Sequence, residues 1–149
     1  MAEKTDPILL GSDHAGFEMK EYIKQYLTEE NIPFEESGAI EYDSTDDYPV
    51  IAFNLAKKIA SGEFARGILL CGTGIGASIA ANRVKGVRAA LCSSPEIARM
   101  SRLHNNSNVL VLGGRITARD MVIEIINAWL GGTFEGGRHQ KRIDQLDSI

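Results

Sequence analysis

Runs of consecutive apolar residues alternate along the chain with longer stretches in which apolar residues recur every three or four positions. A continuous apolar run is typical of a strand buried on both faces of a parallel sheet, whereas the longer period is typical of a surface helix. The second strand is expected at an edge of the sheet, because Pro33 cannot donate a hydrogen bond to a neighbouring strand. In all, the pattern predicts five strands, at residues 8–11, 32–35, 67–71, 87–91 and 109–112.

The stretches that follow these strands predict helices, at residues 16–27, 48–59, 77–84, 95–104 and 117–130. Ser94 is typical of the start of the fourth helix, because a serine side chain can accept a hydrogen bond from the first free N–H groups. Thr117 and Asp120 have the spacing of a capping box for the last long helix, and the glycines at 131–132 end it.

The alternation of strands and helices predicts an α/β fold with right-handed crossovers. We expect a single domain over residues 1–149, a Rossmann-like three-layer α/β/α sandwich around a five-stranded parallel sheet of strand order 2-1-3-4-5. Ligands of such sheets bind beyond the carboxyl ends of the strands. The candidate functional residues are therefore those that follow strands, at 12–14, 71–76, 92–93 and 113–115.

Composition narrows the class of protein. The 149 residues suffice for one domain, and 16 Lys and Arg against 20 Asp and Glu give a net charge of −4, which argues against a nucleic-acid partner. No apolar run approaches the roughly 18 residues of a membrane span, and the N-terminus has no apolar signal core. Two widely spaced cysteines exclude a disulfide framework and a Cys-x-x-Cys metal or redox site. We therefore expect a cytoplasmic protein with no membrane or nucleic-acid partner.

The densest group of glycines follows the third strand, at residues 72, 74 and 76. Three glycines let the backbone turn sharply and direct several N–H groups towards an anion or oxyanion at a helix start. A tight turn without a ligand is the alternative. The spacing Gly-x-Gly-x-Gly departs from the dinucleotide fingerprint, and no lysine follows Gly76 as a P-loop requires.

Cys71 stands directly before this loop. It either packs as a small apolar side chain or acts as a base, because a helix start and loop amides favour a thiolate. Cys92 lacks a comparable loop, and we expect it to be structural. A nucleotide-binding regulatory module remains an alternative, but it would need an acidic residue after the fourth strand, where Cys92 and Ser93 stand.

Two further groups carry candidate chemistry. Asp13 and His14 follow the first strand. His14 could simply cap the helix that begins near Gly16, or the Asp-His pair could serve proton transfer or phosphate binding. Arg138 and Arg142 are four positions apart, so they share one face if the tail is helical. Two guanidinium groups on one face suit a phosphate, although a solvated tail is the alternative.

The direction of the helices separates His104 from Cys71. The helix that begins at Pro95 starts at the carboxyl edge of the sheet and runs back, so His104 at its far end should lie at the opposite edge, about 15 Å away for ten helical residues. If His104 acts together with Cys71, a second subunit most simply supplies it. This predicts a homodimer with active sites shared between subunits.

Five stretches together closely resemble the ribose-5-phosphate isomerase type B family, which also contains galactose-6-phosphate and allose-6-phosphate isomerases: residues 11–16, 71–76, 78–82, 101–105 and 135–139. The resemblance implies an aldose–ketose isomerase of the non-oxidative pentose phosphate pathway. It would interconvert D-ribose 5-phosphate and D-ribulose 5-phosphate through an enediolate, without a metal or organic cofactor. A six-carbon sugar phosphate is the alternative substrate. The resemblance also implies a dimer with shared sites, with a tetramer left open, and we expect the tail at 133–149 to pack on the partner subunit.

The resemblance also implies roles for single residues. Cys71 would be the base that moves a proton between C2 and C1, with Thr73 beside it. His104, aided by Asp13, would be the acid that opens the sugar ring. The remaining contacts would be His14, Arg138 and Arg142 to the phosphate, the N–H groups of Gly72, Thr73, Gly74, Ile75 and Gly76 to the enediolate oxygen, and Asn105 and Arg115 to the rest of the ligand.

Overall fold

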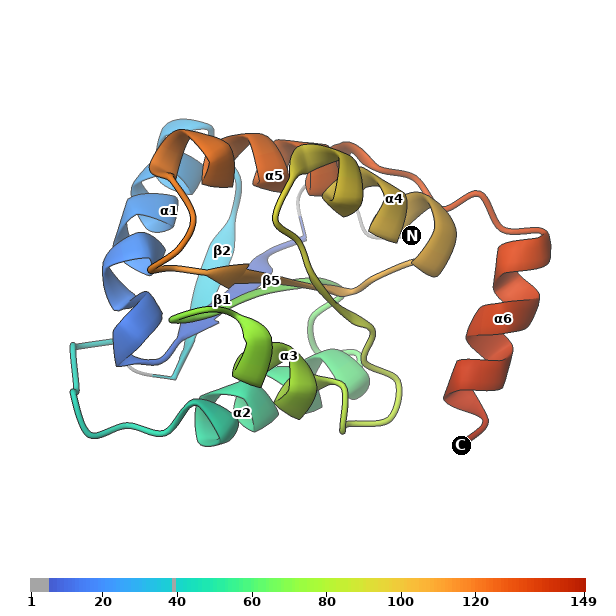
Figure 1. The fold of residues 1–149 in the computed structure, drawn as a ribbon, viewed down its shortest axis with the longest axis horizontal. Coiled ribbons are helices and arrows are strands. Elements are labelled where there is room, and N and C mark those ends of the chain that lie inside the picture. The colour runs from blue at the N-terminus through green and yellow to red at the C-terminus, as the bar shows by residue number, and fades with distance from the viewer. Residues whose placement is uncertain (1–5, 39) are drawn as a thin grey trace.

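The computed structural model describes residues 6–38 and 40–149, which form a sheet between two layers of helices (Figure 1). All neighbouring strands of the sheet are parallel. The strands are β1 (Ile8–Ser12), β2 (Phe34–Gly38), β3 (Gly67–Cys71), β4 (Ala89–Leu91) and β5 (Val109–Gly113). The predicted three-layer α/β/α class is therefore confirmed, and β2 lies at an edge as Pro33 indicated.

The strand order is β2-β1-β3-β5-β4, so the predicted order 2-1-3-4-5 is wrong at β4 and β5. Burial explains the difference. Every residue of β5 is buried, as a central strand covered by helices on both faces requires. In β4, by contrast, Ala89 and Ala90 are half-buried and Leu91 is exposed, which suits a short edge strand. The prediction assumed that strands consecutive in the sequence are neighbours in the sheet. This holds in most proteins but not here.

One face of the sheet is covered by α1 (Phe17–Glu29), α4 (Pro95–Asn105) and α5 (Arg119–Gly131), and the other by α2 (Tyr48–Ala60) and α3 (Ile75–Ala81) (Figure 1). Side chains alternate between these two cores along each strand. Ile8 and Leu10 belong to the core with α1, α4 and α5, whereas Leu9 belongs to the core with α2 and α3. Within the described part of the chain, no helix has the length and apolar character needed to cross a bilayer.

Several predicted boundaries are shifted. β2 begins two residues later than expected, β4 is shorter, and α3 begins at Ile75, inside the glycine loop. The capping box predicted for α5 is wrong: the helix begins at Arg119, so Thr117 stands one residue too early to cap it. Asp120 instead accepts the neighbouring N–H of Met121 at 2.9 Å. The predicted cap of α4 is confirmed, because Ser94 accepts the N–H of Ile97 at 3.2 Å.

The tail after α5 forms a further helix, α6 (Arg138–Asp147), which lies beside the end of α4 (Figure 1). His139 and Ile143, four positions apart, are its buried residues. Arg138 and Arg142, also four positions apart, are exposed. The helical tail therefore places the two arginines on one face, as the sequence predicts for a helical conformation.

Candidate active site

The loops after β1, β3 and β5 pack on one another at the carboxyl edge of the sheet. Three backbone hydrogen bonds join them: Asp13 N–H to Leu70 O at 3.3 Å, Gly114 N–H to Cys71 O at 2.8 Å, and Arg115 N–H to Gly72 O at 3.0 Å. A Cβ added to Gly114 would lie 3.0 Å from the Cα of Gly16, so the first and last loops also touch. The structure thus brings together three of the candidate loops that lie far apart in the sequence.

Cys71 ends β3 opposite Gly113 of β5 and is 5% exposed. Its side chain belongs to the core that includes Leu9, Ala77 and Val111. The thiol therefore combines both features considered for it, since it packs against apolar neighbours and stands where the strand gives way to the glycine loop.

Two glycines of this loop are required by packing and backbone conformation. Gly74 has φ +81°, and a Cβ there would lie 2.5 Å from Leu91 Cδ1 and 3.0 Å from the backbone carbon of Leu112. A Cβ on Gly76 would lie 2.6 Å from ring atoms of Tyr48. The loop is thus pressed between β5 and the start of α2, and these two glycines are explained whether or not the loop binds an anion.

The amides of the loop are not equivalent. Thr73 Oγ1 accepts the N–H of Ile75 at 3.2 Å, so the chain itself satisfies this amide. The N–H of Gly76, the second residue of α3, has no acceptor within the helix, because the first helical N–H groups precede the first turn. Gly76 is therefore a better candidate for an oxyanion donor than Ile75.

His14 is held by Asp46, which lies in the loop between β2 and α2. One carboxylate oxygen of Asp46 lies 2.7 Å from Nδ1 of His14 and accepts the His14 backbone N–H at 3.0 Å. The ring of Tyr42 meets the imidazole edge-on, with centroids 6.2 Å apart. The imidazole is 27% exposed. Because Nδ1 faces the carboxylate, Nε2 is the nitrogen left to face a ligand.

Asp13 is buried and caps the short 3-10 turn η1 (His14–Gly16), with its carboxylate accepting the N–H of Gly16 at 3.1 Å. The side chain that caps this turn is therefore that of Asp13, whereas the sequence suggested a cap by His14. The part of Asp13 in ring opening stays a prediction.

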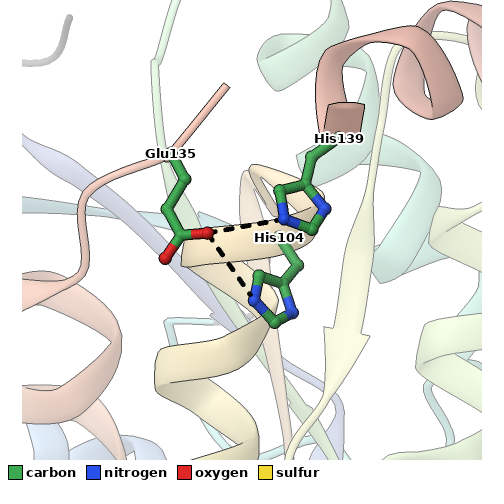
Figure 2. Close-up of side chains that lie close together, drawn as sticks. All are labelled: His104, Glu135 and His139. Atoms are coloured by element: carbon green, nitrogen blue, oxygen red, sulfur yellow. Dashed lines mark ion pairs between the residues drawn. The ribbon is translucent and has the colours of Figure 1, made fainter. Parts of the chain in front are cut away.

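A second group of side chains lies where α4 ends and α6 begins (Figure 2). Oε1 of Glu135 lies 3.8 Å from Nε2 of His104 and 3.4 Å from Nε2 of His139. The two imidazole rings are stacked, with centroids 4.4 Å apart and an interplanar angle of 16°. Burial, Arg138 and His104 lower the pKa of His139 below its usual value, against the opposing effect of Glu135, so this imidazole is neutral near pH 7.

The two groups lie at opposite edges of the sheet. Cys71 is paired with Gly113 at the carboxyl ends of β3 and β5, whereas Asn105 ends α4 shortly before β5 begins. A five-residue strand is about 16 Å long. Figure 1 shows α6 at the far end of the sheet from the starts of α1 and α5. Within one chain, His104 and Asn105 therefore lie away from Cys71, as the helix directions indicate, and Arg138 and Arg142 lie with them on the exposed side of α6.

Among the described residues, two groups place three possible metal ligands within 4.8 Å of one another: Asp13 with His14 and Asp46, and His104 with Glu135 and His139. In the first group, both carboxylates already accept hydrogen bonds from their own chain. In the second, Nε2 of His139 is buried and has no hydrogen-bond partner.

The sequence reasoning missed Asp46, Tyr48 and Glu135. Asp46 and Tyr48 lie after β2, the one strand whose following loop was left out of the candidate set. The rule that ligands bind beyond the carboxyl ends of strands could have found that loop. Glu135 and His139 have the four-residue spacing of neighbours on a helix, but Glu135 precedes α6, so only the folded chain shows that they meet.

The fold and these loops define the class of protein: a doubly wound α/β protein with a candidate small-molecule site at the carboxyl edge of its sheet. Comparison with known proteins then identifies the family. Residues 8–146 match the family model described as Ribose/Galactose Isomerase, and the chain belongs to this family.

Individual relatives agree along nearly the whole chain. Ribose-5-phosphate isomerase B of Escherichia coli is 44% identical over 142 residues, which cover 95% of each chain. A ribose 5-phosphate isomerase of Thermotoga maritima has a similar crystal structure, with 46% identity, a TM-score of 0.92 and coverage of 97% of this chain and 99% of that one. Ribose-5-phosphate isomerase B of Mycoplasma genitalium, with bound ribulose-5-phosphate, is 40% identical, with a TM-score of 0.92 and coverage of 98% and 97%. The resemblance inferred from the motifs is confirmed.

Proposed function

We propose that this protein is an aldose–ketose isomerase that interconverts D-ribose 5-phosphate and D-ribulose 5-phosphate. The observation that carries the proposal is the packing of the Cys71 loop against the loops of Asp13 and Arg115 at one edge of the sheet. The relatives named for this reaction support it, including one whose structure contains ribulose-5-phosphate.

The proton transfer is assigned to Cys71. Its thiolate removes the proton from C2 of the open-chain aldose, and the carbonyl electron pair moves onto O1 to give the enediolate. The same proton returns at C1, while a hydroxyl proton passes from O2 to O1 and leaves the ketose. Thr73 stands beside this transfer, and backbone N–H groups at the start of α3 stabilise the developing oxyanion. One such donor is worth about 3 kcal/mol of barrier.

The phosphate is assigned to side chains from both edges of the sheet. His14, fixed by Asp46, offers Nε2 at the carboxyl edge. Arg138 and Arg142 share an exposed face of α6 at the other edge and add two guanidinium groups. Arg115 and Asn105, both exposed, contact the rest of the ligand. Binding energy from the phosphate holds the reacting carbons in place during proton transfer.

The distance between the two edges favours a homodimer whose sites combine residues from both subunits. His104 of one subunit, with Asp13 of the other, opens the sugar ring, and the tail at 133–149 packs against the partner. Exposed large apolar side chains on α3, at the end of β4 and near the start of α4 support this proposal. They are 40–57% exposed: Ile75, Ile79, Leu91 and Ile97. Large apolar side chains left in water are typical of surfaces that associate.

A six-carbon sugar phosphate is the second candidate substrate, because the family model covers ribose and galactose isomerases alike. The ratio of kcat/KM for ribose 5-phosphate to that for allose 6-phosphate and galactose 6-phosphate decides between them. Ribose 5-phosphate should give the highest value. A higher value for either six-carbon substrate would replace the proposed substrate.

The base is tested with a pair of cysteine variants. Cys71→Ala should lower kcat by about 10²-fold to 10⁴-fold, the usual contribution of a positioned base. Cys92→Ala should keep kcat near that of the wild type, because Cys92 is buried in the opposite core. Circular dichroism checks that both variants fold. Full turnover by Cys71→Ala would overturn the assignment of the base.

A further inference from the structure

The structure assigns a second ligand-binding role to the junction of α4 and α6: we propose that His104, Glu135 and His139 form a site for Zn²⁺ or a similar transition-metal cation, and that its occupation inhibits the isomerase. The inhibition rests on the proposed function, because it requires His104 to be the acid of ring opening. The binding itself does not.

The separations of the three ligand atoms fit a four-coordinate ion. With bonds of 2.0–2.1 Å to nitrogen and oxygen, the ligand atoms of a tetrahedral zinc site lie about 3.3 Å apart. Glu135 Oε1 lies 3.4 Å from Nε2 of His139 and 3.8 Å from Nε2 of His104. The three atoms lie within 4.8 Å of one another. These separations exceed those of a zinc site by at most about 1.5 Å, a difference that rotation of one imidazole can close.

The burial of Nε2 of His139 indicates a bound cation independently of these distances. The residue is 8% exposed, and this nitrogen is buried without a hydrogen-bond partner. A buried polar atom without a hydrogen bond costs free energy, and a bound cation would remove that cost. Figure 2 shows this side of the imidazole directed towards Glu135.

The backbone holds the three ligands in place. The N–H of Glu135 donates to Leu103 O at 3.0 Å, which ties the loop before α6 to the last turn of α4 beside His104. The N–H of His139 donates to Gly136 O at 3.1 Å, which closes the first turn after that loop. The ligands therefore belong to one connected backbone unit.

One ring must turn before both imidazoles can bind the same ion. A metal–nitrogen bond lies in the plane of its imidazole, and the two rings are stacked almost in parallel. His104 is the ring free to move, because its side chain is 32% exposed and stands in the last turn of α4, whereas that of His139 is 10% exposed. Glu135, 49% exposed, leaves a fourth position open to water.

The set of two imidazoles and one carboxylate is a common zinc ligand set with an open position. Coordination would use the Nε2 lone pair of His104, so this nitrogen could no longer carry the proton needed for ring opening. The other three-ligand group, around His14, is less suited, because Asp46 Oδ1 and Asp13 Oδ1 are engaged by hydrogen bonds within the chain.

The test begins with protein that has been freed of metal by a chelator and desalted. Zn²⁺ is titrated by calorimetry, and Co²⁺ is added separately to record the visible absorption of the bound ion. One ion should bind per chain with a tetrahedral Co²⁺ spectrum. Glu135→Gln should weaken Zn²⁺ binding at least about tenfold, since even outer-shell changes at metal sites cost this much. Glu124→Gln, an exposed glutamate on α5, is the matched control and should bind as the wild type does.

Activity is measured separately, with each variant compared with its own metal-free rate. Zn²⁺ should inhibit the wild type reversibly, and Glu135→Gln should need at least about ten times more Zn²⁺ for the same inhibition. No binding, binding unchanged in Glu135→Gln, or a sulfur-to-cobalt absorption band that places the ion on a cysteine would overturn the proposal. Absence of isomerase activity in metal-free protein would instead refute the proposed function and leave the binding result intact.

Discussion

One carboxylate oxygen of Asp46 accepts both the backbone N–H of His14, at 3.0 Å, and the Nδ1–H of its ring, at 2.7 Å. These residues are 32 positions apart and come from the loops after β2 and β1. The contact fixes the turn that begins α1 and also fixes the orientation of the imidazole. Asp46 therefore positions His14. The proposed proton transfers are assigned to other side chains.

Asp46→Asn should raise KM for ribose 5-phosphate more than it lowers kcat, because His14 is assigned to the phosphate. A hydrogen bond to a charged group is worth about 1.5–3 kcal/mol, so kcat/KM should fall roughly tenfold or more. Asp47→Asn is the matched control, because Asp47 follows Asp46 directly, is exposed, and makes no side-chain hydrogen bond to cap α2. Steady-state kinetics of both variants check the prediction, and equal effects on KM would contradict it.

Shared active sites predict complementation between inactive chains. Cys71→Ala would remove the proposed base and His104→Ala the proposed ring-opening acid, so each homodimer should be inactive. In a mixed dimer, one of the two sites would keep both groups, and about a quarter of the wild-type activity should return when equal amounts exchange freely, since half of the dimers are mixed.

Two differently tagged chains allow the mixed dimer to be isolated and its turnover measured. Isolated mixed dimers without activity would contradict the shared site. A monomer in analytical ultracentrifugation would contradict the dimer itself.

Alanine substitutions at Gly74 and Gly62 distinguish the free-energy cost of backbone strain from that of steric crowding. Both have positive φ, +81° and +82°, so an alanine at either position costs about 1 kcal/mol through the left-handed conformation. A Cβ on Gly62 meets no atom within 4 Å, whereas one on Gly74 would lie 2.5 Å from Leu91 Cδ1 and 3.0 Å from Leu112. Gly74→Ala should therefore destabilise the protein by about 1–3 kcal/mol more than Gly62→Ala. Urea unfolding of the two variants measures the difference, and equal losses would contradict the crowding.

The ion pairs of Glu36 predict that the folded protein loses stability in acid. Its partial burial alone would raise the pKa, but hydrogen bonds and charge from Lys20 and Lys24 outweigh it and lower the pKa below 4.5. A lowered pKa stabilises the folded state above the ordinary value, and this contribution is lost as the pH falls through the folded-state pKa.

The free-energy gap between wild type and Glu36→Gln should accordingly be full near pH 7 and shrink below pH 4.5. At neutral pH it should be about 3 kcal/mol, because the substitution removes the charge of a carboxylate that lies 3.0 Å from the fully buried Lys20. Urea unfolding across this pH range checks the prediction. A gap that does not change with pH would contradict it.

The sequence alone indicated the local structure and most of the candidate site. Continuous apolar runs identified β1, β3 and β5, and Ser94 marked the start of α4. The spacing of Arg138 and Arg142 placed them on one face once the tail proved helical. These features depend on a residue and its neighbours within a turn or two, so they can be read along the chain. The five motif stretches, taken together, were specific enough to identify the family.

Only the tertiary structure decided what depends on distant packing. It placed β5 between β3 and β4, because the fully buried strand belongs in the centre and the half-exposed one at the edge. It brought Asp46 to His14 and Glu135 to His104 and His139, contacts that no local pattern predicts. Charge pairing and burial act through space, and which side chains meet across loops is set by the way the sheet and its helices close on one another.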